Sequence, residues 1–324
     1  MKKYLEYIIV IGILLITLVG VLIYKKSTLK PYDRNYFYMD TYINVKLYSN
    51  SENKALKALD EIDKIFMEYH NLTDMYNSYE GGLYNLNNGS TSVNPKLKDI
   101  ISYGYSWYDK SDGLLNIAIA NVSSLWKEYI KKEDGVPKLS TLEKLNINIK
   151  DVIINDNITL NNNVKIDLGA IAKGYTCDEV AKYLKSIGIT KYIINAGGNV
   201  LVGEKVKKDG YKIGIQSPYE DDKLVKILKI SDKAIVTSGG YNRGYTYNGV
   251  KYNHIINPKT LYPADNMLSV TVISSSSALA DALSTTLFLM DVETGMEFIK
   301  GYDAEAIWYL EDNVYMTDGF KNYE

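Results

Sequence analysis

Cysteine is almost absent from this sequence. The 324-residue chain contains one cysteine, Cys177, which excludes an intrachain disulfide and any metal site built from several cysteines. Cys177 falls on the apolar side of a predicted helix, so we expect a buried thiol without a chemical role. The scarcity of cysteine also favours export of the main part of the chain from the cytoplasm.

The sequence also lacks an excess of positive charge. Its formal net charge is −2 at pH 7, and a chain without a basic field is not expected to bind nucleic acid. Proline is scarce, with 6 residues, and histidine is scarcer, with 2. The rest of the composition, 46% hydrophobic and 23% charged residues, is ordinary for a globular protein with a sizeable core.

An uncharged apolar run opens the chain. It extends from Tyr7 to Tyr24 between flanking lysines, which is near the lower limit for a membrane span and longer than most signal-peptide cores. No small-residue cleavage site and no cysteine for lipidation follow it. We therefore predict an uncleaved N-terminal transmembrane signal anchor with its linker at residues 1–30, ahead of one domain at residues 31–324.

Two signals oppose each other on the orientation of this anchor. More lysines follow the run than precede it, and a literal positive-inside count keeps the domain in the cytoplasm. Large domains, however, are translocated with little regard to such charges. We predict a single-pass protein of the cell membrane whose domain is extracytoplasmic.

The rest of the chain mixes strands and helices without a regular βαβ pattern. This mixture predicts an α+β fold, a single mixed α/β domain of two lobes. We expect linker structure at residues 25–35, and a hairpin that turns at residues 155–157. The predicted helices are 51–70, 95–108, 172–188 and 277–290, and the predicted strands are 41–48, 191–203 (broken at Gly197–Gly198), several within 211–256, 269–274, and a last one in EAIWYL at 305–310.

The stretch DLGAIAKGYTCDEVAKYLKSIG, from Asp167 to Gly188, is unusual at its front. An acid, two glycines and a lysine crowd the start of a predicted amphipathic helix. The N–H groups at the start of a helix are unpaired and attract anions. The segment therefore predicts an anion site without identifying the anion.

Asp281 and Thr285 lie four residues apart in ALADALSTTLFLM, on a helix that is otherwise apolar. Their oxygens therefore face the same way and could give a hard cation such as Mg²⁺ two ligands. The alternative is a self-satisfied helix start, in which Asp281 accepts hydrogen bonds from nearby N–H groups. Spacing alone leaves both open.

His254 lies at the end of a predicted strand, just before Asn-Pro, within TSGGYNRGYTYNGVKYNHIINPKTLYP. Catalytic groups often occupy such strand ends. The alternative is a histidine that fixes the turn by hydrogen bonding. The other histidine, His70, lies late in a predicted surface helix, and we expect no chemical role for it.

These segments occur together in an informative order. The blocks VKIDLGAIAKGYTCDEVAKYLKSIGITKYIINAGGNV, TSGGYNRGYTYNGVKYNHIINPKT and SVTVISSSSALADALSTTLFLM resemble the FAD:protein FMN transferase (ApbE-like) family. Two earlier blocks, YMDTYINVKLY and SDGLLNIAIANVSSLW, are similar to it as well. The resemblance runs from about residue 36 to residue 310.

The resemblance implies a reaction and its substrates. Enzymes of that family bind FAD and Mg²⁺, cleave the flavin at its pyrophosphate, and esterify FMN to a threonine or serine of an acceptor protein. AMP is released. The implied acceptor is an exported or membrane protein with a short flavinylation motif that contains Ser or Thr, and the implied anion is the pyrophosphate of FAD.

The resemblance also assigns roles to individual positions. His254 is the candidate base, and Asp281, Thr285 and the Ala170 position are the implied metal ligands. The implied FAD contacts are Met39, Tyr76, Leu114, Leu115, Asn116, Asp167, Lys173 and Ile255.

Four positions depart from the family pattern. Asp40 and Leu261 stand where the family usually has glycine, and Asn116 and Asn199 where it usually has aspartate. Asparagine removes negative charge but keeps an acceptor oxygen. Two other functions remain open at the level of sequence: an FAD pyrophosphatase that releases FMN and AMP, and a non-catalytic flavin-binding surface protein.

Overall fold

The computed structural model describes residues 28–206, 208–241 and 243–324, together with residues 4, 12 and 17. Most of the predicted anchor at residues 1–30 therefore lies outside the described residues. Among the residues that are described, none of the helices is both long and apolar enough to span a membrane. The anchor and the location of the domain stay predictions.

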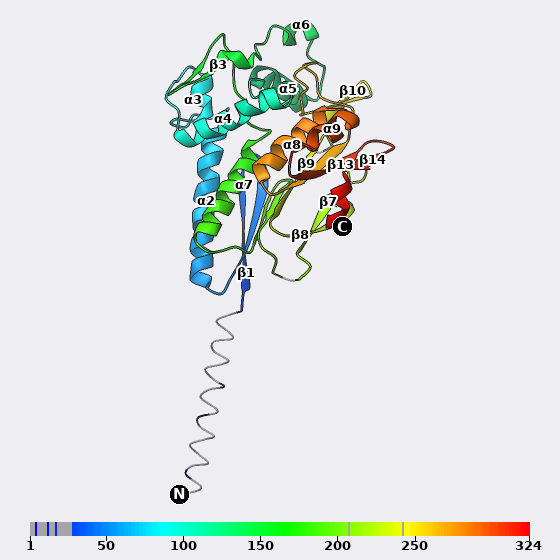
Figure 1. Ribbon diagram of the computed structural model, residues 1–324. Helices are drawn as coiled ribbons and strands as arrows, with labels where there is room; N and C mark the ends of the chain where they lie inside the picture. Colours follow the sequence, from blue (N-terminus) through cyan, green and yellow to red (C-terminus); the bar gives the residue numbers. More distant parts are fainter. Residues whose placement is uncertain (1–3, 5–11, 13–16, 18–27, 207, 242) are drawn as a thin grey trace.

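An eight-stranded sheet forms the centre of the fold (Figure 1). All its neighbouring strands are antiparallel, so side chains alternate between its two faces. On the second strand this places Ile43, Val45 and Leu47 in the core. In spatial order the strands are β1 (Lys30–Tyr38), β2 (Thr41–Ser49), β5 (Tyr192–Ala196), β6 (Asn199–Val202), β9 (Lys233–Gly239), β12 (Ser269–Ser274), β13 (Ala304–Tyr309) and β14 (Val314–Met316).

Strand β1 corrects the prediction of a linker at residues 25–35, since the strand begins at Lys30. It is an edge strand of the sheet. An edge strand tolerates charged residues and proline, and Pro31, Asp33 and Arg34 hid the strand signal. The EAIWYL segment is β13, but it is not the last strand, because the three-residue β14 follows it. Three residues are too few to show a period.

Helices α2 (Glu52–Thr73), α7 (Ala172–Ser186) and α8 (Ser277–Leu289) cover one face of the sheet (Figure 1). The helix predicted to begin at Ser51 is confirmed as α2, and Ser51 is its N-cap, because Ser51 Oγ accepts a hydrogen bond from the Lys54 N–H. Cys177 is confirmed as a buried residue of α7, and burial raises the pKa of its thiol.

The remaining elements gather mainly at the end of the sheet opposite the start of β1 (Figure 1). The predicted helix start at Pro95 and the hairpin that turns at residues 155–157 are both confirmed. The elements gathered at that end of the sheet are α3 (Leu83–Asn87), α4 (Pro95–Lys110), α5 (Ala120–Lys132), α6 (Leu139–Leu142), the 3₁₀ turn Ile149–Asp151, β3 (Val152–Ile154), β4 (Ile158–Leu160), β10 (Gly244–Tyr247) and β11 (Val250–Asn253). The elements that lie elsewhere are β7 (Tyr211–Gln216), β8 (Leu224–Ile230), α9 (Val292–Ile299) and the 3₁₀ helix Asp318–Tyr323.

The predicted break at Gly197–Gly198 is confirmed as the tight turn between β5 and β6. Both glycines have positive φ, +56° and +98°, which side chains rarely allow. At Gly197 a Cβ atom would lie 1.8 Å from Thr41 Oγ1. Only glycine therefore lets this turn pack against the start of β2.

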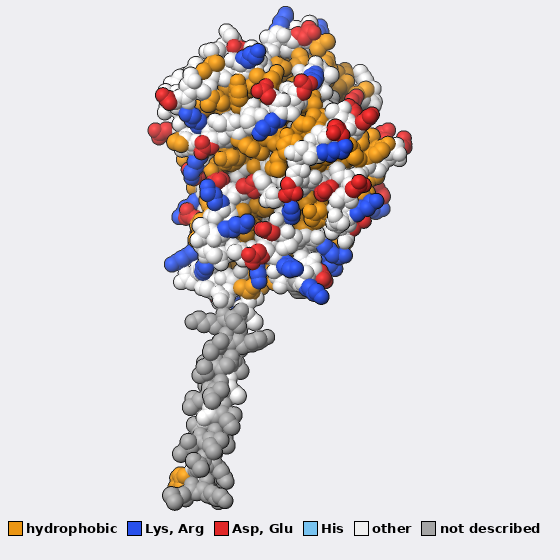
Figure 2. All heavy atoms as spheres, in the orientation of Figure 1, with side chains coloured by type: hydrophobic (Ala, Val, Ile, Leu, Met, Phe, Trp, Pro, Cys, Tyr) orange, Lys and Arg blue, Asp and Glu red, His pale blue; other side chains and the backbone are white. Residues whose placement is uncertain are grey.

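The described residues form one mixed α/β domain around a main hydrophobic core, with two smaller clusters at its margins. The predicted fold class is confirmed, and a division into two lobes stays a prediction. Positive and negative side chains are interspersed on the face that Figure 2 shows. This mixture agrees with the absence of a basic field in the composition.

Candidate active site

A cleft of about 760 Å³ lies between α5, α7, α8 and the strands β6, β7 and β9, and residues directly before and after the hairpin β10–β11 also line it. It brings together most of the residues that the sequence singled out, although these come from separate parts of the chain. The predicted residues that line it are Leu114, Leu115, Asn116, Asp167, Ala170, Lys173, His254, Ile255, Asp281 and Thr285.

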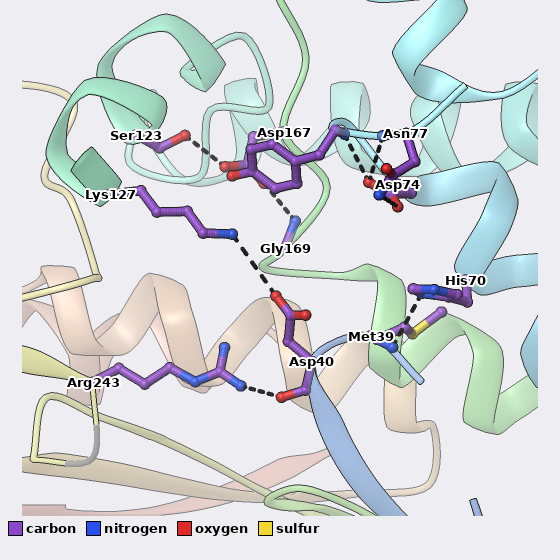
Figure 3. A network of polar contacts seen from close by, with 11 residues as sticks. Met39, Asp40, His70, Asp74, Asn77, Ser123, Lys127, Asp167, Gly169 and Arg243 are labelled. Atoms are coloured by element: carbon purple, nitrogen blue, oxygen red, sulfur yellow. Dashed lines mark hydrogen bonds and ion pairs between the residues drawn. The ribbon is translucent and has the colours of Figure 1, made fainter. Parts of the chain in front are cut away.

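Asp167 is held by two donors at the entry of α7. Its Oδ1 accepts from the Gly169 N–H at 2.8 Å, and its Oδ2 accepts from Ser123 Oγ of α5 at 2.6 Å (Figure 3). Lys173 Nζ lies on the same turn, 3.4 Å from the Gly169 carbonyl oxygen. A lysine, a helix start and a fixed carboxylate thus share one wall of the cleft.

Part of the predicted anion site at the start of α7 is filled by the protein itself. The Gly174 N–H donates to Asp281 Oδ2 of α8 at 2.8 Å. In an uninterrupted helix that N–H would bind the carbonyl of Ala170, four residues earlier. Among the described residues, no hydrogen bond ends on the Ala170 carbonyl, so this oxygen stays available at the cleft.

Asp281 is 3% exposed. Burial raises the pKa of its carboxyl, although the Lys173 ammonium and the Gly174 N–H both favour the ionised form. Asn199 is buried beside it, and its amide also lowers the pKa of Asp281. Asn199 Nδ2 has no hydrogen bond of ordinary geometry to the described part of the chain. A buried carboxyl group of this kind is stabilised either by protonation or by a further positive partner.

Thr285 lies one turn after Asp281 and lines the same cleft. Its Oγ1 is 3.4 Å from Ser238 Oγ of β9, which in turn binds Ser284 Oγ at 2.8 Å. The Asp281 carboxylate, the Thr285 hydroxyl and the Ala170 carbonyl are three oxygen donors of residues that line the same cleft, and oxygen donors suit a hard cation. No cluster of three or more His, Cys, Asp or Glu side chains that could hold a metal occurs within the described ranges.

His254 follows β11 and faces the cleft. The cleft walls withdraw it from bulk water, and this burial is the main cause that lowers the pKa of its imidazole to about 4; the Arg243 guanidinium lowers it further. The side chain still has an exposed surface on the cleft side. The ring is neutral at pH 7.

The segment Leu114–Asn116 is fixed mainly by hydrogen bonds to itself and to its neighbours. Asn116 Oδ1 accepts from the Ala118 N–H, and its Nδ2 donates to the Ile147 carbonyl, both at 2.9 Å. An aspartate here could keep the first bond but could not donate the second. The departure at Asn116 is thus used to hold the cleft wall in place.

Met39 and Tyr76 are not among the residues that line the cleft. The Met39 N–H donates to Nδ1 of His70 at 3.2 Å (Figure 3). The Tyr76 ring lies beneath Lys127 Nζ, 4.0 Å from its centre. His70 thus holds the turn between β1 and β2 by a hydrogen bond, and the flavin contacts of Met39 and Tyr76 stay predictions.

Sequence reasoning missed Ser123, Ser238 and Arg243. Arg243 is a charged residue within the block that contains His254, and this position could have drawn attention to it. The two serines carry no local signal, because their partners Asp167 and Thr285 are distant in sequence.

Comparison with known proteins agrees with this geometry. The family model described as the ApbE family matches residues 39–308. The chain is similar to proteins named FAD:protein FMN transferase from Vibrio cholerae, with 30% identity and 88% of each chain covered, and from Klebsiella pneumoniae, with 31% identity and 85% and 87% covered.

Solved structures of the same kind share the fold. The ApbE protein of Thermotoga maritima superposes with a TM-score of 0.83 at 26% identity, over 91% of this chain and 99% of the other. The flavin transferase ApbE of Vibrio cholerae gives 0.78 at 26% identity, over 91% and 100%. The chain therefore belongs to the ApbE family, which confirms the family and the enzyme class that its motifs predicted.

Proposed function

We propose that this chain transfers FMN from FAD to a serine or threonine of an acceptor protein, with Mg²⁺ as cofactor. The acceptor oxygen forms a bond to the phosphorus of the FMN half, and the bond from that phosphorus to the AMP oxygen breaks. The hydroxyl proton passes to a base, and AMP leaves. One observation carries the proposal: Lys173, His254 and Asp281 line a single cleft in a member of this family.

The residues of the cleft have different proposed roles, which depend on their charge. Lys173 and the start of α7 favour the pyrophosphate of FAD. His254 is neutral near pH 7, so it can accept the hydroxyl proton, a contribution typically worth about 10²–10⁴-fold in rate. If the predicted contacts of Leu114, Leu115, Asn116 and Ile255 are made, the flavin lies against the side of the cleft that these residues line.

Asp281, Thr285 and the Ala170 carbonyl would hold Mg²⁺. They fit it because all three donors are oxygens, and because within the described part of the chain no ion pair holds Asp281 and no hydrogen bond ends on the Ala170 carbonyl. When bound, the ion supplies positive charge that neutralises the phosphoryl group as it moves. The buried Asp281 carboxylate at the cleft is the feature of this structure that supports the metal.

The acceptor and the location follow from the resemblance and from the N-terminal sequence. We propose an exported or membrane acceptor with a Ser- or Thr-containing flavinylation motif. The apolar run from Tyr7 to Tyr24 supports attachment to the cell membrane by a single N-terminal helix, and we propose that the domain lies outside the cytoplasm.

FAD pyrophosphatase activity is the second candidate. The observation that favours it is the exposed surface of His254 in an open cleft, where water could replace the acceptor hydroxyl. The test is incubation of the full chain, in detergent micelles, with FAD, Mg²⁺ and a candidate acceptor. Covalent flavin on the acceptor supports transfer, free FMN with an unmodified acceptor supports hydrolysis, and unchanged FAD indicates a flavin-binding protein without turnover.

A further inference from the structure

Arg243 contacts His254 through its backbone. Its carbonyl oxygen accepts from the His254 N–H at 3.2 Å and lies 3.3 Å from Nδ1 of the His254 ring. Arg243 and His254 face each other directly beyond Gly244 and Asn253, the last residue pair of the β10–β11 hairpin. A carbonyl can only accept, so the Nδ1 contact requires the proton on Nδ1. In the neutral ring this leaves Nε2 as the basic atom.

The side chain of Arg243 reaches a different part of the fold. Its Nη2 donates to the Asp40 carbonyl oxygen at 2.8 Å (Figure 3). Asp40 and Met39 form the turn between β1 and β2, both with positive φ, 55° and 53°. The Asp40 carboxylate faces Lys127 Nζ at 3.8 Å. Because the bond uses the Asp40 carbonyl, the departure from glycine at this position does not affect it.

This contact links two different sheets of the fold. The hairpin β10–β11 forms its own two-stranded sheet, while β1 and β2 belong to the eight-stranded sheet. Arg243 lies at the open end of the hairpin, opposite His254, and its guanidinium is fixed to the edge of the larger sheet. A planar guanidinium loses little freedom when it forms such a bond, so it can hold the carbonyl that orients the imidazole.

We propose that Arg243 is a positioning residue for the transfer reaction, because its guanidinium anchors the hairpin to Asp40 while its carbonyl holds His254 in the tautomer with a free Nε2. The inference deepens the proposed function, since it assumes that His254 is the base. Charged groups from three segments face this imidazole: Arg243, Lys173 of α7 and Asp167 before it.

Nitrogen-15 NMR of histidine-labelled full chain in micelles tests the tautomer directly. The chain has 2 histidines, and a His70→Gln variant assigns them. His70 is an internal contrast, because its Nδ1 accepts from the Met39 N–H, which requires the opposite tautomer. We expect Nδ1–H at His254; an Nε2–H signal there would overturn the proposal.

Two substitutions at Arg243 separate position from charge. Arg243→Met should lower kcat about tenfold or more, give His254 a mixture of tautomers, and move the acidic limb of the pH profile to higher pH, since a nearby cation is removed. Arg243→Lys should lower kcat but leave that limb in place. Arg34→Met is the matched control, because Arg34 binds Asp60 away from the cleft; its kcat and tautomers should not change.

Other outcomes reject the proposal. A higher KM for FAD with unchanged kcat would make Arg243 a phosphate-binding residue instead. Unchanged tautomers in both variants, or loss of activity only in proportion to unfolding, would leave no positioning role. Full transfer activity in His254→Ala would show that His254 is not the base. The NMR measurement of the His254 tautomer does not depend on that result, so the two failures can be distinguished.

Discussion

The Gly174 N–H of α7 donates to Asp281 Oδ2 of α8 at 2.8 Å, across 107 positions of sequence. The two helices meet very closely here, because a Cβ atom on Gly174 would lie 2.4 Å from the Ser277 carbonyl oxygen and 2.6 Å from Asp281 Cβ. Asp178 of α7 adds a second link, since its carboxylate accepts from the Ser277 and Ala278 N–H groups at the start of α8. The position of Asp281, the candidate metal ligand, thus depends on residue 174 being a glycine.

Gly174→Ala should therefore destabilise the protein and displace Asp281. Overpacking of this kind costs about 1–3 kcal/mol, and we expect transfer activity to fall further than stability alone explains. Thermal unfolding and activity measured on the same preparation check this. Gly301→Ala is the control, because its added Cβ would meet nothing closer than 3.5 Å. Equal effects of the two variants would contradict the packing argument.

Asp281 gives a prediction about metal and stability together. Asp281→Ala should abolish Mg²⁺-dependent turnover, since Thr285 and a carbonyl alone leave the ion without its charged ligand. Asp281→Asn should do the same but stabilise the metal-free protein at pH 7 by on the order of 1 kcal/mol, because it removes a buried charge. The raised pKa of Asp281 means that the metal-free wild type gains stability as pH falls through the folded-state pKa.

Calorimetry with and without Mg²⁺ measures these effects independently of turnover. The ion should raise the melting temperature of the wild type and leave that of both variants unchanged. Wild-type activity that stays constant across a Mg²⁺ titration would remove the metal assignment.

The location of the domain can be tested in cells. We expect a phosphatase that is active only outside the cytoplasm to work when it is fused to the C-terminus, because the domain is proposed to be translocated with the anchor. A reporter that functions only in the cytoplasm should be inactive at the same position. The reverse pattern would place the domain in the cytoplasm and make the lysine count after Tyr24 the deciding signal.

Local signals explain which parts of the fold the sequence could predict. The cap at Ser51, the proline at the start of α4 and the glycine pair between β5 and β6 each specify their own conformation within a few residues. The start of β1 at Lys30 could not be read this way, because an edge strand is allowed charged residues and proline.

The same distinction between local signals and contacts of distant segments applies to the candidate site. The spacing of Asp281 and Thr285 on one helix was visible in the sequence. The bond from Gly174 to Asp281 and the bond from Arg243 to Asp40 join distant segments, so no local pattern could indicate them. The departure at Asn116 was visible, but its purpose was not, because the Ile147 carbonyl that it binds lies 31 residues further on.

His254 carries the sharpest prediction about chemistry. If it is the base, His254→Ala should keep FAD affinity within a few-fold and lower transfer by about two orders of magnitude or more. The reason is that a base acts on the acceptor hydroxyl in the transition state, while FAD is held in the ground state by other groups. Weaker FAD binding, earlier melting and a proportional loss of activity would instead identify a residue that only fixes the Asn257–Pro258 turn.

The pH profile distinguishes the same two roles. An unperturbed histidine would give a limb near pH 6.5, but burial and Arg243 lower the pKa of His254 to about 4. Transfer should therefore rise as pH increases through about 4 and stay level near pH 7, and the variant should lack this limb. The stability of the folded protein also falls towards acid pH. Because the unfolded chain binds the proton on His254 more tightly than the folded protein does, stability decreases as pH drops from about 6.5 towards 4. A wild-type limb that persists unchanged in His254→Ala would assign it to another group.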